Sequence, residues 1–217
     1  MPTLLSSTIL SKSPTPLLQI MATTKIDICS TALILIGANT ISSFTDGSTE
    51  ANVCNTVYED LLKASLTRHR WHFATEQKQL SLLTAEPTGR YKYAYQLPTN
   101  PELLQLITLT VNDKVIPYER YGDKVFLDNY GSNSAVICDY VFRQDEAEFP
   151  PHFILALEYS LASLFAGSIA RDSGMIKQFA EMAERQYLIA KNVDTAERTT
   201  QKIDHSRFIN NRQSTGT

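Results

Sequence analysis

The segment PPHFILALEYSLASLFAGSIA, residues 150–170, carries the clearest structural signal in the sequence. Two prolines open it, and proline is tolerated in the first turn of a helix because its missing N–H has no helical partner there. Large apolar side chains surround the predicted helix on every side, and Glu158 is the only charged residue between His152 and Arg171. A helix that is apolar all round is buried on all sides, in a large core, in lipid or between subunits.

A membrane span is the first alternative for this helix, since about twenty residues just cross a bilayer. Glu158 and three serines lower its hydropathy, however, and no basic flank sets an orientation, so we expect no membrane. A chain of 217 residues has a limited core with which to surround a helix. We therefore expect one face to pack on the chain's own helices and another to contact a neighbouring copy. The residues assigned to this subunit interface are Phe153, Leu157, Leu161 and Phe165.

Three further helices are predicted around this segment. Thr24 and Asp27 have the spacing of a capping box, and Gly37 supplies the stop of the first helix. In the second helix, Glu59 and Lys63 are placed to form an ion pair on the polar face. The predicted helices cover residues 24–36, 49–69, 151–170 and 174–194.

Between the second and third helices the apolar period changes to two, which is typical of strands. Trp71 and Phe73 flank His72 and predict strand structure, and Tyr91, Tyr93 and Tyr95 alternate strictly, which predicts three rings on one face of a strand. Short connections require antiparallel pairing. Further strands are expected at 103–111, 115–118, 124–127 and 135–142, with hairpin turns at 112–113, 121–123 and 129–133. The sequence thus predicts an α+β fold, a bundle of about four helices with an antiparallel β-rich insertion over 71–142.

The two ends of the chain differ from its middle. Residues 1–20 are rich in Ser, Thr, Pro and Leu, with Lys12 their only charge, and do not follow the pattern of a secretory signal. We expect them to be a disordered or non-native extension before Met21. The folded domain is expected to cover 21–195, and residues 196–217 are expected to be a flexible, polar tail.

Composition excludes several classes of protein. Lys and Arg number 20 against 23 for Asp and Glu, so the chain lacks the basic excess of a general nucleic-acid binder. Cys29, Cys54 and Cys138 are far apart and form no CxxC pair, which argues against a zinc knuckle, a thioredoxin-type site or a disulfide framework. Glycine-rich phosphate loops and the motifs of zinc proteases and serine hydrolases are absent from the sequence. We therefore expect no cofactor and no catalytic residue.

His69 and His72 are the nearest approach to a metal site. If the segment is extended, their rings point to opposite faces, and no patterned set of further ligands lies nearby. We expect no metal, and interpret the pair as a histidine at a helix end and a surface histidine.

An acidic cluster precedes the long helix. Asp145, Glu146 and Glu148 are interpreted as carboxylates that share solvent and favour the positive N-terminus of that helix. Catalysis by a carboxylate pair would need two environments that push the two pKa values apart. An enzyme, for instance a tail-associated peptidoglycan hydrolase using Glu148 or Glu158, is kept as an alternative.

The alternating tyrosines could stack nucleic-acid bases, as on an RNA-binding sheet. Only Arg90 and Lys92 lie beside them in the sequence, fewer basic residues than such a surface would require. We therefore assign Tyr91, Tyr93 and Tyr95 to packing on a helix or on a neighbouring subunit. A nucleic-acid-binding module is kept as the second alternative.

Four short segments, taken in order, resemble the tail tubular protein A family, the head-to-tail adaptors of short-tailed bacteriophages. The resemblance spans residues 25–192, and it departs from the family in the N-terminal extension and at Asn100, where many relatives have Asp. The segments are ALILIGANTISSF at 32–44, RHRWHFA at 68–74, YKYAYQLP at 91–98, and the stretch from YVF to FPPHF at 140–153.

The resemblance implies a non-catalytic structural protein of the virion tail or neck, assembled in the host cytoplasm. Such adaptors form a homo-oligomeric, dodecameric ring that binds the portal, carries the tail tube or nozzle below it, and lets DNA pass through its lumen during ejection without specific binding. A closed ring requires two different, complementary faces on each chain. We assign portal contact to the C-terminal tail, with Arg207, Phe208 and Ile209 as its anchors.

Overall fold

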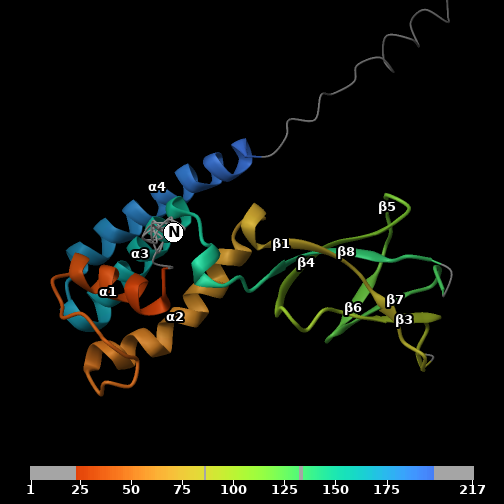
Figure 1. Ribbon diagram of the computed structural model, residues 1–217, viewed down its shortest axis with the longest axis horizontal. Helices are drawn as coiled ribbons and strands as arrows, with labels where there is room; N and C mark the ends of the chain where they lie inside the picture. Colours follow the sequence, from red (N-terminus) through yellow and green to blue (C-terminus); the bar gives the residue numbers. More distant parts are fainter. Residues whose placement is uncertain (1–22, 86, 132–133, 198–217) are drawn as a thin grey trace, which may run out of the picture.

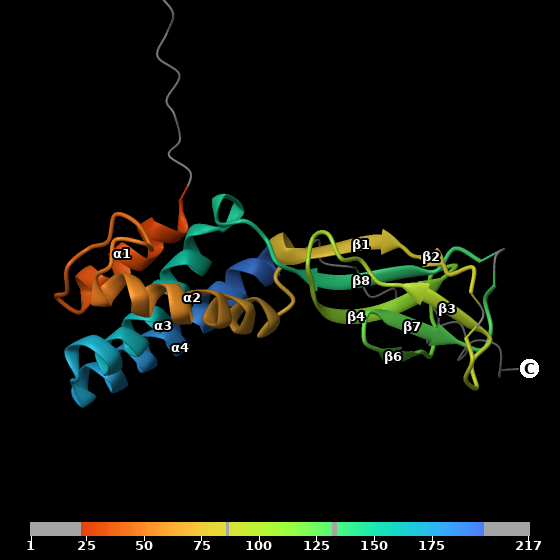
Figure 2. The same cartoon turned by 90° about the horizontal axis from the view of Figure 1, so that it is seen from below.

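The computed structural model describes residues 23–85, 87–131 and 134–197, and within them the chain forms a helical lobe and a β lobe (Figures 1 and 2). The predicted α+β class is confirmed, with the β lobe inserted between the second and third helices. The expected extension at 1–20 and nearly all of the expected tail lie outside the described residues.

Four helices build the helical lobe. The helix predicted after the two prolines is central, because it packs against each of the other three. Its last turn widens into a π-helix, η3, and a left-handed residue, Arg171 with φ 53°, then turns the chain into the last helix. The helices are α1 (Lys25–Leu35), α2 (Thr49–Thr67), α3 (Pro151–Phe165) with η3 (Ala166–Ala170), and α4 (Ser173–Ala196).

Local sequence signals set the helix ends. The predicted capping box is confirmed, since the Thr24 hydroxyl accepts the Asp27 N–H at 3.2 Å and the Asp27 carboxylate accepts the Thr24 N–H at 2.9 Å. Ser48 and Asp172 cap α2 and α4 in the same manner, through side-chain oxygens that accept first-turn N–H groups. Gly37, with φ 75°, ends α1 in the left-handed conformation that glycine adopts without strain.

Eight strands form two antiparallel four-stranded sheets. The first sheet has the order β1-β8-β4-β5 and the second the order β2-β3-β7-β6. The strands are β1 (Thr75–Gln79), β2 (Ser81–Leu82), β3 (Tyr93–Gln96), β4 (Leu103–Val111), β5 (Lys114–Val115), β6 (Glu119–Tyr121), β7 (Lys124–Leu127) and β8 (Ile137–Phe142).

The two sheets share both of their edges and close into a barrel. Residues 75–82 run from β1 into β2, and the Leu80 N–H at the corner donates to the Val136 carbonyl at 2.8 Å. Residues 114–121 run likewise from β5 into β6, and the Ile116 N–H at that corner donates to the Leu109 carbonyl at 3.0 Å. The chain thus passes from one sheet to the other at both edges, and these two bonds extend the ladders of the first sheet into the corners.

Three strand and turn predictions are wrong. Trp71 and Phe73 do not begin a strand, because the chain makes the 3-10 turn η1 (His72–Ala74) that drives Trp71 into the core. Of the strand predicted at 115–118 only Val115 lies in a strand, because residues 116–118 form the corner between β5 and β6. The turn at 129–133 is not a hairpin, since it joins β7 of one sheet to β8 of the other. The turn at 112–113 does form a hairpin, with both residues at positive φ.

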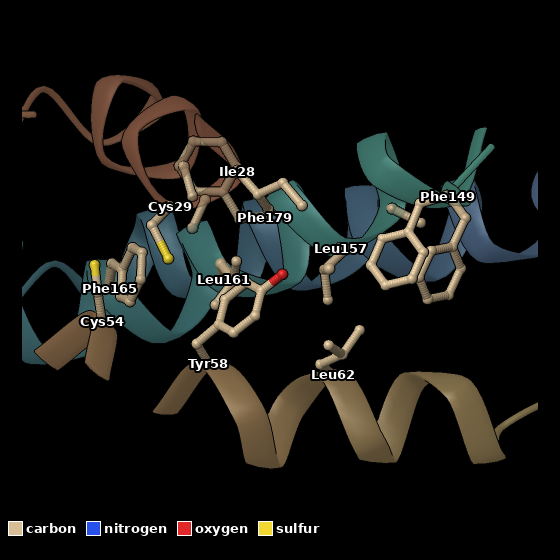
Figure 3. Packing of buried hydrophobic residues seen from close by; sticks show 14 of the residues in the cluster. Ile28, Cys29, Cys54, Tyr58, Leu62, Phe149, Leu157, Leu161, Phe165 and Phe179 are labelled. Atoms are coloured by element: carbon tan, nitrogen blue, oxygen red, sulfur yellow. The ribbon is translucent and has the colours of Figure 1, made fainter. Parts of the chain in front are cut away.

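Each lobe has its own apolar core. The helical core gathers side chains from α1, α2, α3 and α4 around α3, as Figure 3 shows. The barrel core is made by inward-facing residues of both sheets, among them Tyr95, Leu109 and Val125. Val141 of β8, with Leu104 and Ile107 of β4, belongs to the helical core and joins the lobes.

Candidate interaction surfaces

The four residues of α3 that the sequence assigned to a subunit interface lie in the chain's own core. Phe153, Leu157, Leu161 and Phe165 are each 0% exposed, and Figure 3 shows Leu157, Leu161 and Phe165 directed among residues of the neighbouring helices. A side chain without exposed surface cannot contact a second copy unless the fold opens. The interface prediction for these residues is therefore corrected: α1, α2 and α4 supply the cover that we expected from another subunit.

The helical lobe nevertheless leaves an apolar surface uncovered. Ile34 of α1 is 61% exposed, Leu164 of α3 is 44% exposed, and Leu188 of α4 is 62% exposed. These exposed side chains lie on three helices, α1, α3 and α4. We call the following eight residues the helical apolar surface: Ile34, Leu155, Leu164, Ile176, Met182, Leu188, Ile189 and Val193.

The segment Pro151–Ala170 is the one described helix that is long and apolar enough to cross a membrane. Length and hydropathy alone do not distinguish a membrane span from the core helix of a folded domain. Here α3 packs against α1, α2 and α4, and six of its residues from Phe153 to Phe165 are buried among them. This is the packing of a core helix.

The three tyrosines do not share one face of a strand. Strand β3 begins only at Tyr93, so Tyr91 precedes it. Tyr93 packs against the barrel core and Tyr95, 1% exposed, belongs to it, with its hydroxyl donating to the Tyr130 carbonyl at 2.6 Å. Tyr91 packs instead with Phe126, their ring centroids 6.0 Å apart. Tyr95 is thus corrected from an interface residue to a core residue.

Tyr91 contributes to an aromatic cluster on the outer face of the second sheet. Phe126 pairs with Ala94, which alternates with the inward tyrosines, so its ring points outward. The ring centroid of Tyr121 lies 5.6 Å from that of Phe126 and 6.5 Å from that of Tyr91. We call Tyr91, Tyr121 and Phe126 the outer aromatic cluster.

The guanidinium of Arg90 lies 4.8 Å from the centroid of the Tyr91 ring and donates a hydrogen bond to the Tyr91 hydroxyl. Contact with this hydroxyl raises the pKa of Arg90. The cluster therefore has one cationic flank.

The acidic cluster before α3 is not uniformly solvated. Glu146 is only 7% exposed and accepts hydrogen bonds from the Tyr58 hydroxyl at 3.1 Å and the Arg143 guanidinium at 2.6 Å. Asp145 and Glu148 are exposed, as expected. The prediction of shared solvent is wrong for Glu146, because α2 and the end of β8 enclose it.

Arg143 ties the end of the barrel to α2. Its guanidinium also binds Glu59, with nitrogen–oxygen distances of 2.9 and 3.2 Å. The hydrogen bond from Arg143 lowers the pKa of Glu59, while burial raises the pKa of Tyr58. Glu59 does not pair with Lys63 as predicted, since the Lys63 ammonium binds Glu102 at 2.9 Å. We call Tyr58, Glu59, Arg143 and Glu146 the junction network.

The histidine pair lies beside a buried carboxylate. Asp194 of α4 is 1% exposed, accepts the His72 backbone N–H at 2.8 Å, and lies 3.4 Å from Nε2 of His69. Asp194 thereby fixes the 3-10 turn that follows α2. Across the part of the chain that the structure describes, no three His, Cys, Asp or Glu side chains gather as a metal ion would require.

The two carboxylates of the enzyme alternative lie in different surroundings. Glu158 is half-buried on α3 and has the Thr31 hydroxyl as a partner; its burial raises its pKa. Glu148 is exposed in the 3-10 turn η2 (Glu146–Glu148).

Sequence reasoning did not find the junction network. Tyr58 and Glu59 lie 88 and 84 residues from the groups they bind, so no local pattern links them. The sequence offered one signal for this network: Arg143 directly follows a predicted strand and stands three residues before Glu146.

The comparisons with known proteins identify no relative. No family model matches the chain, and no curated protein matches it. The expectations about partners and function therefore rest on the sequence motifs and on the surfaces described above.

Proposed function

We propose that this chain is a structural subunit of a head-to-tail adaptor ring in a short-tailed bacteriophage. Copies of the chain would surround a lumen between the portal and the tail tube or nozzle, and DNA would pass through this lumen. The proposal is supported by the order of the four motif segments and by an architecture that carries them on a helical lobe with an inserted β lobe. Its place is the virion tail or neck, and the role is not catalytic.

The helical apolar surface is the observation that carries this proposal. A ring needs two different faces on each subunit, one of which binds the complementary face of the next subunit. Ile34 lies on α1, and Leu188 and Ile189 lie on α4, two helices on opposite sides of α3 (Figure 2). Exposed apolar residues therefore lie on more than one helix of the lobe, and we assign them to the contacts around the ring.

Charge supports the proposed channel. With a net charge of -3, the chain lacks the basic excess that would hold phosphates in a lumen and slow the passage of DNA. The proposed portal contact through Arg207, Phe208 and Ile209 lies outside the described residues.

The proposal is tested by the mass of the chain alone and with a portal. We expect light scattering after size exclusion to give a closed oligomer, and micrographs to show a ring docked on a purified portal of a short-tailed phage. The double variant Leu188→Ser/Ile189→Ser should fail to assemble, because both residues belong to the exposed surface. Asn192→Ser, an exposed change on the same helix, is the matched control. A parent chain that stays monomeric beside the portal would refute the proposal.

The alternative of a peptidoglycan hydrolase has a separate test. The parent chain, Glu148→Gln and Glu158→Gln are assayed on purified cell wall. We expect no release of soluble fragments by any of them. Lysis by the parent that either substitution abolishes would replace the structural proposal with an enzymatic one.

A further inference from the structure

The outer face of the second sheet carries a groove on each side of the Tyr91–Phe126 contact. One depression, of about 260 Å³, extends from these two rings to Tyr118, Glu119 and Asp128. The other, of about 350 Å³, extends from the same two rings past Tyr121 to Pro87 and Arg90. Because Tyr91 and Phe126 line both depressions, the two form one interrupted groove, which we call the outer groove.

The chemistry of the outer groove favours an extended peptide. Aromatic-lined grooves bind proline-containing segments in the polyproline II conformation, since these segments lose little entropy on binding. Glu119 and Asp128 make one end of the groove acidic, whereas Arg90 makes the other end basic. A matching segment therefore has a basic residue on the side of its proline that meets Glu119 and Asp128, and no basic residue on the side that meets Arg90.

We propose that the outer groove binds residues 11–18 (SKSPTPLL) of a second copy of this chain. These residues lie outside the described part of the structure. The inference deepens the proposed function, on which it rests, by naming a contact between copies. It also gives a role to the segment that sequence analysis left outside the fold.

The segment fits the groove in charge and in composition. It contains Pro14 and Pro16 followed by Leu17, the residue types that aromatic-lined grooves bind. Lys12, the only charge among the first twenty residues, then faces the acidic end at Glu119 and Asp128. The reverse direction would bring Lys12 to Arg90 and is disfavoured by like charge.

The length of the connection assigns the segment to a second copy. Residue 18 is separated from Thr24, the cap of α1, by six residues, which span at most about 20 Å when fully extended. The start of α1 is held at the junction of the lobes, where Nζ of Lys25 lies 3.6 Å from Glu59. Strands β3 and β7, which flank the groove, lie toward the end of the molecule away from the helices (Figure 1). We therefore assign the segment to the groove of another copy.

The inference is tested by photo-crosslinking in the full chain. Leu17 is replaced by a benzophenone amino acid, copies with heavy and light isotopes are mixed and irradiated, and mass spectrometry maps the products. We expect heavy-to-light products that join position 17 to peptides containing Pro87, Arg90 or Tyr121. Benzophenone at Leu5 is the position control and should give no product in the groove.

A charge swap tests whether Lys12 lies at the acidic end of the outer groove, beside Asp128. Asp128→Lys should lower the yield of the product about two- to fivefold, as expected for one exposed ion pair, and Lys12→Glu in the partner copy should restore it. Asp60→Lys, an exposed change on α2, should leave the yield unchanged. An unchanged yield with Asp128→Lys overturns the proposed direction and the inference with it.

The oligomeric mass of the same samples, measured by light scattering, shows whether rings form. It therefore tests the proposed function separately from this inference. Rings that form without groove products, or products confined to one chain, overturn the inference and leave the adaptor proposal standing. Heavy-to-light groove products without rings support the inference and count against the adaptor.

Discussion

In the helical lobe one central helix packs against three others, whereas the barrel closes on itself through two segments that belong to both sheets. The barrel buries its core between its own two sheets. The helical lobe encloses α3 but leaves Leu164, Leu188 and Ile189 exposed. Apolar residues in a sequence therefore do not by themselves locate an interface: those of α3 that look most suited to one are core, and the exposed ones are distributed over three helices.

The largest loss of stability is expected when Trp71 is removed, because Trp71 is fully buried where the helical core meets the barrel. Its ring packs with Phe153 at a centroid distance of 5.1 Å, and its Nε1 donates to the Ser65 carbonyl at 2.9 Å. Trp71→Ala should lower the free energy of unfolding by about 3–5 kcal/mol, measured by urea denaturation. Tyr121→Ala, on the exposed side of the barrel, should change it by less than about 0.5 kcal/mol. Equal losses would contradict the contrast between core and surface rings.

The junction network is the polar link between the two lobes, so its variants test how the two lobes are held together. Arg143→Met leaves Glu146 buried without its guanidinium partner and should cost about 3 kcal/mol. The double variant Arg143→Met/Glu146→Met should recover most of this loss in the same denaturation experiment, since the buried carboxylate is removed with its partner and the half-exposed Glu59 keeps Lys25, 3.6 Å away. A double variant as unstable as the single one would show that packing of Arg143, not its charge, holds the junction.

A smaller effect is expected at the start of the helical lobe. Thr24→Ala removes the hydroxyl that accepts the Asp27 N–H and should lower the free energy of unfolding by about 1 kcal/mol. Thr40→Ala, an exposed change in the loop after α1, serves as the control. If both variants lose the same stability, the cap contributes nothing.

The smallest effect is the response to acid. The hydrogen bond from the Thr24 hydroxyl lowers the pKa of Asp27, and that from Arg143 lowers the pKa of Glu59. A carboxyl whose pKa is lower in the folded state stabilises the fold above its unfolded pKa, and this stabilisation is lost as the pH falls through the folded pKa. Asp27 is exposed and Glu59 is partly buried, so these two groups together should lower stability by less than about 1 kcal/mol between pH 5 and pH 3. Denaturation of Thr24→Ala across this range should show a shallower fall than the parent.

Local signals in the sequence predicted much of the fold. The capping box at Thr24 and the turn at Asn112-Asp113 depend on contacts within four residues, and both were predicted. The 3-10 turn after Trp71 and the passage from β7 to β8 depend on tertiary packing and were missed. The interaction surface was harder to predict for the same reason. Whether an apolar residue of α3 is exposed depends on helices that are distant in the sequence.

The strands that lead into and out of the barrel are hydrogen-bonded neighbours, since Thr75 of β1 lies opposite Val141 of β8. The helical lobe therefore needs from residues 75–142 two chain ends held side by side and the three residues of β4 and β8 that pack into its core, Leu104, Ile107 and Val141. Insertions and deletions elsewhere in the barrel could accumulate without displacing α2 or α3. The two lobes can thus diverge at different rates, and barrels exchanged between distant variants of this chain should remain compatible with the same helices.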